Sequence, residues 1–124
     1  MRDFRNIDVW KKSHALTLLI YKMTAAFPKE ETYGLTSQIR RASSSIGANI
    51  AEGCGSDSDP EFARYLPNAM KSATELEYHL LLARDLDLLA PDKYSEVEPM
   101  ITEVKRMLAS FIRKLRPRTE WPEI

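Results

Sequence analysis

The sequence predicts an all-α fold, an antiparallel up-and-down four-helix bundle, and three observations support this prediction. Four segments of the 124-residue chain place apolar residues every three or four positions, which is the period of an amphipathic helix. Prolines and glycines separate these segments, so the connections between them are short. No segment alternates apolar and polar residues as a β-strand does. Short connections favour antiparallel neighbours, and the length predicts a single domain over residues 1–124.

The first helix is predicted over residues 8–27, where one face is apolar. Its apolar residues are spaced by seven, four, three and four positions: Val9, Leu16, Ile20, Met23 and Phe27. Pro28 ends this helix, because a proline pushes the residue before it out of the helical region.

The second helix is predicted over residues 35–53 and is rich in serine, alanine and glycine. These small residues predict that a neighbouring helix packs closely against it. Gly53 and Gly55 end the helix, since glycine tolerates the left-handed conformation that is common after a helix.

The third helix is predicted over residues 59–89. Ser58 caps its start, Glu61 completes a capping box, and Pro60 lies in the first turn. Pro67 is expected inside this helix and should kink it. Leucines surround the C-terminal half, and a surface this apolar often contacts another subunit.

The fourth helix is predicted over residues 93–116, with two alternatives for its start. Either a helix from about residue 93 is kinked at Pro99, or a short turn precedes a helix that begins at Pro99. Pro117 closes this helix, and residues 117–124 form a frayed tail.

The charge of the chain is balanced as a whole and segregated along the sequence. Eighteen basic and eighteen acidic residues give a net charge of zero, which argues against indiscriminate binding to nucleic acid or to anionic membranes. Residues 1–50 carry a charge of +4, residues 51–104 carry −8 and residues 105–124 carry +4. This segregation could direct self-association or partner choice.

Several function classes lack the residues that they need. The one cysteine, Cys54, excludes a disulfide framework within one chain and favours a reducing, cytoplasmic setting. Neither a signal peptide nor a membrane span is predicted. Glu75 and His79 share a helix face, but one pair offers too few ligands for a metal. The sequence therefore predicts a non-enzyme with no cofactor, no metal and no small-molecule substrate.

Six basic residues are candidates for nucleic-acid contact. Two lie on the second helix and four on the fourth: Arg40, Arg41, Lys105, Arg106, Arg113 and Arg116. They could bind phosphates, or they could pair with the acidic third helix, where Glu75, Glu77, Asp85 and Asp87 cluster. Aromatic and basic residues do not alternate along the chain as they do in proteins that stack unpaired bases.

Asn49 and Glu52 are expected to have a structural role near the end of the second helix. They adjoin Ile50 and Gly53, so we expect both to be partly buried and to hydrogen-bond exposed backbone groups at the turn, for example the N–H groups that open the third helix. The alternative is that they contact a ligand.

The sequence closely resembles the bacterial four-helix-bundle family encoded in intervening sequences of 23S ribosomal RNA genes. The resemblance lies in Tyr33-Gly-Leu-Thr-Ser-Gln-Ile-Arg-Arg-Ala42, followed by Ser45-Ile46 and by Asn49-Ile-Ala-Glu-Gly53. It assigns Asn49, Glu52 and Gly53 to the family motif and covers residues 4 to 116. It implies a helical subunit that forms a ring-like pentamer, with no established enzymatic activity. Related bundles are accessory partners of reverse transcriptases, and their basic surface is thought to hold nucleic acid.

Two hypotheses follow for the function. The first is a non-catalytic homo-oligomeric bundle that contacts RNA through basic patches, which the subunit arrangement concentrates. The second is a protein-interaction scaffold or accessory subunit with no direct contact to nucleic acid.

Overall fold

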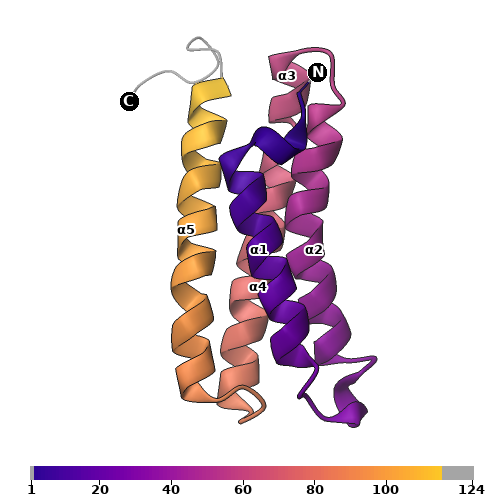
Figure 1. Ribbon diagram of the computed structural model, residues 1–124, viewed down its shortest axis with the longest axis vertical. Coiled ribbons are helices and arrows are strands. Elements are labelled where there is room, and N and C mark those ends of the chain that lie inside the picture. The colour runs from indigo at the N-terminus through magenta and orange to yellow at the C-terminus, as the bar shows by residue number, and fades with distance from the viewer. Residues whose placement is uncertain (1, 116–124) are drawn as a thin grey trace.

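The computed structural model describes residues 2–115, within which four long helices run antiparallel (Figure 1). They are α1 (Asp8–Thr24), α2 (Leu35–Cys54), α4 (Leu66–Asp85) and α5 (Pro91–Leu115). Three short elements complete this part of the chain: the 3-10 helices η1 (Phe4–Asn6) and η2 (Lys29–Glu31), and the helix α3 (Asp59–Ala63). Residues 2–115 contain no strand. The predicted all-α, antiparallel four-helix bundle is confirmed.

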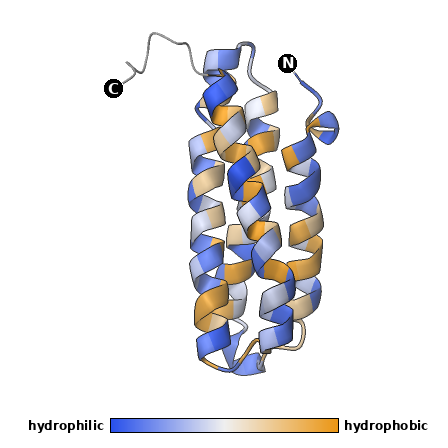
Figure 2. Cartoon of the chain, turned by 90° about the vertical axis from the view of Figure 1, so that its left-hand side faces the viewer, coloured by the Kyte–Doolittle hydropathy of each residue, from blue (hydrophilic) through white to orange (hydrophobic). Residues whose placement is uncertain are grey.

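The four long helices surround one apolar core. α1 packs against α2 and α5, and α4 packs against the same two helices. α1 is therefore diagonal to α4, and α2 is diagonal to α5. Each long helix contributes fully buried side chains, among them Leu16, Ile39, Leu76 and Ile101. Hydrophobic and hydrophilic positions are interspersed along the helices in view (Figure 2), as expected when one face of a helix is buried.

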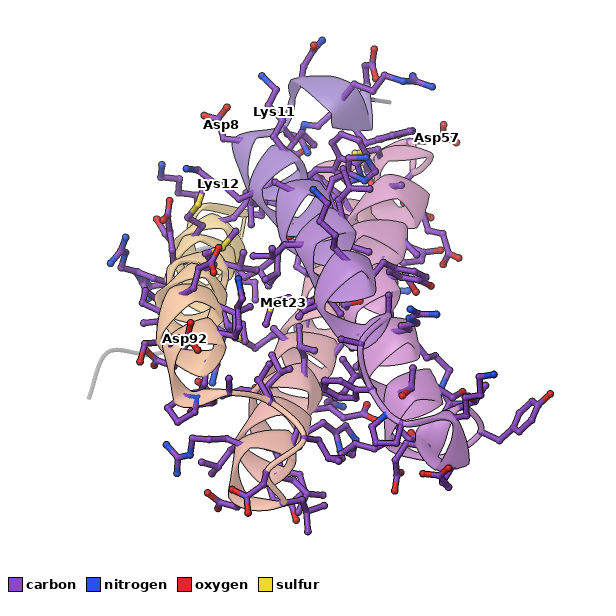
Figure 3. All side chains as sticks on the ribbon, turned by 60° about the horizontal axis from the view of Figure 1, so that its bottom comes forward. Asp8, Lys11, Lys12, Met23, Asp57 and Asp92 are labelled. Carbon is purple, nitrogen blue, oxygen red and sulfur yellow. The ribbon has the colours of Figure 1, made fainter. Side chains whose placement is uncertain are left out.

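The side chains of α1 illustrate this division. Met23 points into the bundle and packs against the core, whereas Asp8, Lys11 and Lys12 point outward (Figure 3). Lys12 reaches Glu103 of α5, with 3.3 Å between nitrogen and oxygen.

α1 is shorter than the predicted 8–27 helix, because it ends at Thr24. Pro28 has no N–H with which to bond the Thr24 carbonyl four residues earlier, and its ring would clash with that carbonyl. The carbonyl instead accepts the N–H of Phe27 at 3.0 Å, in a tighter turn. Phe27 still packs into the core.

α2 extends one residue beyond the predicted 35–53 helix, and the expected left-handed end is wrong. No glycine in residues 2–115 has a positive φ, and Gly55 has a φ of −75°. Gly53 lies inside the helix, where a Cβ atom would come 2.5 Å from Cδ1 of Phe62. Close approach of α3 therefore explains this glycine.

The predicted helix over 59–89 is two helices, and Pro67 does not kink either of them. The predicted cap is confirmed, since the Ser58 hydroxyl accepts the N–H of Glu61 at 3.3 Å. However, α3 ends at Ala63, and Pro67 lies in the first turn of α4. A proline is tolerated there because its missing N–H would have no partner within the helix.

α4 also ends four residues earlier than predicted. The N–H of Leu88 bonds the Ala83 carbonyl at 2.9 Å, and the N–H of Asp87 bonds the Arg84 carbonyl at 3.0 Å. These two bonds form a Schellman motif, in which Asp87 takes the left-handed position with a φ of 62°. Glycine usually occupies this position, so the sequence offered no stop signal here.

α5 settles the two alternatives for the last helix. It is continuous from Pro91 to Leu115 with Pro99 inside it, and it begins two residues before the predicted start at 93. Pro91 occupies the first helical position, which suits proline. The predicted end at residue 116, Pro117 and the tail 117–124 lie outside the described residues.

Candidate nucleic-acid interface

Arg40 lies in the first half of α2 and binds the end of α1. Its Nε donates to the hydroxyl of Thr24 at 2.8 Å, and its Nη2 donates to the carbonyl of Tyr21 at 3.2 Å. The guanidinium carbon also lies 4.8 Å from the centre of the Tyr21 ring. A cation suits this position because carbonyls at a helix C-terminus carry partial negative charge. Arg40 is therefore a half-buried link between two helices as well as a positive charge.

Arg41 is exposed and has no carboxylate partner within residues 2–115. Its Nη2 donates to the side-chain oxygen of Gln38 at 2.9 Å. The side chain is thus positioned by a neutral group, and its charge remains available to an anion.

The candidates on α5 divide into paired and unpaired residues. Lys105 is half-buried and pairs with Glu77 of α4 at 2.9 Å. This contact agrees with the alternative prediction that the basic residues pair with the acidic third helix. Arg106 and Arg113 are exposed, and neither has a carboxylate within 4.0 Å among residues 2–115. Arg116 lies outside the described residues.

A single subunit does not gather these candidates into one patch. α2 and α5 are diagonal in the bundle and make no contact with each other. Arg40 and Arg41 lie near the end where α1 turns into α2, whereas Arg106 and Arg113 lie toward the opposite end (Figure 1). One ligand can contact the α2 arginines and the α5 arginines together only if it is extended or if the two groups come from different subunits.

The structure agrees with the expected partial burial of Asn49 but not with the rest of the expectation for Asn49 and Glu52. Asn49 is half-buried, but its amide donates to the Ser45 carbonyl at 2.8 Å and to the Ser45 hydroxyl at 3.2 Å, both within α2. Glu52 is exposed rather than partly buried. The expected bonds to backbone groups at the turn are wrong, because Asn49 bonds Ser45 within α2 and Ser58 caps the next helix.

An apolar groove of about 500 Å³ runs between α1 and α2. We define it by Trp10, His14 and Leu18 on one side and by the small residues Gly47 and Ala48 on the other. The small residues let α1 approach closely, and Gly47 faces the Trp10 indole. Leu18 is 60% exposed, although it is a large apolar residue.

Sequence reasoning missed the aromatic partners of Arg40 and Arg41. A second groove, of about 510 Å³, is lined by both arginines together with Tyr21 and Tyr33. Tyr21 comes from another helix and Tyr33 from the preceding loop, so only folding brings them beside the arginines. The expectation that aromatic and basic residues stay apart holds along the chain but not in space.

The histidine, carboxylate and cysteine side chains that could take part in catalysis are not arranged as a catalytic or metal site within residues 2–115. His79 lies 3.3 Å from Glu75, and no group of three or more His, Cys, Asp or Glu within residues 2–115 could hold a metal ion. Burial raises the pKa of the Cys54 thiol, while the positive charge of Arg2 opposes this shift. A raised pKa lowers the fraction of the reactive thiolate.

In the part of the chain that the structure describes, no helix combines the length and the apolar character that a membrane crossing requires.

Comparisons with known proteins bear on the whole bundle. A family model described as 23S rRNA-intervening sequence protein matches residues 5–110. A crystal structure described as a protein with unknown function from the S23 ribosomal protein family, from Bacteroides thetaiotaomicron VPI-5482, is similar to this chain with a TM-score of 0.78. The two chains are 30% identical, and the match covers 85% of this chain and 95% of that one. No curated protein matches the sequence.

Proposed function

The chain belongs to the 23S rRNA-intervening sequence protein family, and from this premise we propose that it is a non-catalytic homo-oligomeric bundle that binds RNA. Three exposed arginines carry the proposal: Arg41, Arg106 and Arg113 have no carboxylate partner within residues 2–115. The planar guanidinium group matches the geometry of a phosphate and can bind it through two parallel N–H···O bonds. The single buried cysteine suits the cytoplasm, where such an RNA complex would work.

Self-association is the second half of the proposal. We infer that the apolar groove between α1 and α2 receives α4 of a second copy. Tyr78 of α4 is 57% exposed, Leu86 directly after this helix is 54% exposed, and α4 is diagonal to α1. A subunit with a groove on one side and exposed apolar residues on the other makes head-to-tail contacts, which close into a ring when the rotation permits. The pentamer expected from the family resemblance is one such ring.

A ring of subunits would also multiply the basic groups. Since the α2 and α5 arginines lie on diagonal helices of one subunit, a ring repeats both groups in every copy. Concentrated positive charge strengthens phosphate binding without raising the net charge of the chain, which is zero.

Salt-dependent RNA binding tests the proposal. The variant R41Q/R106Q/R113Q should bind RNA more weakly, and the slope of log affinity against log salt should fall by about 2, since each lost phosphate contact on single-stranded RNA contributes about 0.7. K11Q/K22Q/K93Q removes the same charge from three other surface lysines and is the matched control. Undetectable binding near physiological salt, or equal loss in both variants, would contradict the proposal.

A protein-interaction scaffold remains the second candidate, and the Lys105–Glu77 pair favours it. This pair holds one of the six candidate basic residues against the acidic α4 at 2.9 Å, so that part of the basic surface is neutralised within the subunit. An intact oligomer that binds no RNA at any salt concentration would support the scaffold over the RNA-binding function.

A further inference from the structure

The groove that Arg40, Arg41, Tyr21 and Tyr33 line differs in character from the apolar groove beside it. We call it the basic groove; it has a volume of about 510 Å³ and opens at the end of the bundle where α1 ends and α2 begins. Hydroxyl groups, including that of Ser37, complete its lining. Two positive charges, two phenol rings and hydroxyl groups therefore share one concave surface.

Arg40 is held in place in the free protein. Two of its N–H groups bond Thr24 and Tyr21, and its guanidinium stacks on the Tyr21 ring at 4.8 Å. A guanidinium has five N–H donors, so others are free to bind a ligand. Because these contacts fix the side chain, binding a phosphate costs little further conformational entropy.

Tyr33 is 96% exposed, the highest exposure among the large apolar side chains that the structure describes. It lies in the loop between η2 and α2, directly before the residues that form the wall of the groove. An exposed aromatic ring offers a free face on which an unpaired base can stack, and such stacking tolerates any base.

The N-terminus of α2 does not compete for the phosphate. A carboxylate oxygen of Glu31 accepts the N–H of Leu35 at 3.0 Å, so this helix start is already occupied by a negative charge. An incoming phosphate is therefore directed to the two arginines one to two turns further along α2.

We propose that the basic groove binds one unpaired nucleotide of RNA, with its base on Tyr33 and its phosphate on Arg41 and Arg40. This inference rests on the proposed RNA-binding function and assigns it a site and a strand preference. Single-stranded RNA is the ligand because a base inside a duplex stacks on its neighbours and presents no free face to Tyr33.

The site lies at the edge of the proposed subunit contact. Tyr21 and Ser44 line both grooves, whereas Tyr33 and Arg41 line only the basic one. Substitutions at Tyr33 and Arg41 therefore test the nucleotide site without removing the apolar groove.

The experiment measures binding of a fluorescent single-stranded RNA of about 12 nucleotides, a length within the usual range for one binding module. Y33L should weaken binding about tenfold with no change in salt slope, because it removes stacking but no charge. Y33F, which keeps the ring, should bind within about twofold of the parent chain. R41Q should lower the slope by about 0.7, which R41K should restore.

The outcomes separate this inference from the proposed function. If Y33L binds normally while R41Q/R106Q/R113Q loses affinity, the nucleotide site is wrong and RNA binding stands. If the parent chain binds no RNA, both fail. Equal affinity for the annealed duplex would overturn the site, and so would a change in the mass of Y33L by light scattering, which would place Tyr33 in the subunit contact.

Discussion

The hydroxyl of Ser45 connects two helices through a short polar chain. It accepts hydrogen bonds from the amide of Asn49 at 3.2 Å and from the hydroxyl of Ser72 on α4 at 2.9 Å. Asn49 also bonds the Ser45 carbonyl at 2.8 Å. Asparagine is normally unfavourable inside a helix, so these contacts explain its presence in the C-terminal half of α2.

Asn49→Ala should therefore lower the free energy of unfolding by about 1 kcal/mol, since two net hydrogen bonds are lost and the helix propensity of alanine offsets part of that loss. Glu52→Ala should stay within about 0.5 kcal/mol of the parent chain, because Glu52 is exposed. Urea unfolding of both variants measures the difference. Equal effects would contradict the polar chain as the reason for Asn49.

Cys54 gives a prediction about pH. Burial raises the pKa of its thiol, so the folded chain holds this proton more tightly than the unfolded chain does. The contribution to stability is present below the ordinary thiol pKa and is lost as the pH rises through the raised value. Cys54→Ala should flatten the fall of stability in alkaline solution, as followed by urea unfolding at several pH values. An unchanged alkaline profile would oppose this account.

At the scale of the elements, one contact sets the turn from α2 into α3. Gly53 leaves room for the ring of Phe62, which is 2% exposed and packs edge-on against Phe111 of α5 with 5.3 Å between ring centres. The Phe62 ring cannot move away from Gly53 easily, because Phe111 contacts its other side. The absence of a side chain at Gly53 thus determines how closely α3 approaches α2.

Gly53→Ala should cost about 1–3 kcal/mol of stability, as overpacking of a filled core usually does. Gly47→Ala is the matched control in the same helix, where the added Cβ would lie 3.4 Å from the Trp10 nitrogen. That variant should be neutral or gain up to about 1 kcal/mol, because alanine favours a helix over glycine. Thermal unfolding compares the two. A neutral Gly53→Ala would mean that Phe62 has freedom to shift.

The arrangement of the whole molecule separates its surfaces. The apolar groove lies on the α1–α2 side, whereas the exposed Tyr78 and Leu86 lie on α4 and directly after it. The unpaired arginines of α2 and α5 lie on diagonal helices. One subunit therefore offers complementary surfaces that it cannot bring together itself. Assembly of several copies is the step that would join them.

Leu18→Glu should reduce the mass of the assembly to that of a smaller species in light scattering, because burying an unpaired carboxylate in an apolar contact is unfavourable. Ser95→Glu adds the same charge to an exposed position on α5 and should leave the mass unchanged. A monomeric parent chain at micromolar concentration would refute the ring itself.

Several helix boundaries could not be predicted, because the residues that set them do not usually end a helix or are compatible with more than one position in it. Asp87 ends α4 in a left-handed conformation that glycine usually takes, and the carbonyl bonds of Ala83 and Arg84 stabilise it. The sequence around Pro67 is compatible both with a kink inside one helix and with the start of a new helix. Because α3 ends at Ala63, Pro67 lies in the first turn of a new helix.

The amino-acid sequence by itself determined the fold, since apolar residues at the helical period and proline or glycine between them can bury their surface in few other ways. It also identified the family and the basic residues of interest. Only the tertiary structure decided which charges are free, because Lys105 meets Glu77 across two helices and Arg41 meets no carboxylate in residues 2–115. The same holds for the basic groove: Tyr21 and Arg40 are 19 positions apart, and their contact depends on how α1 and α2 pack.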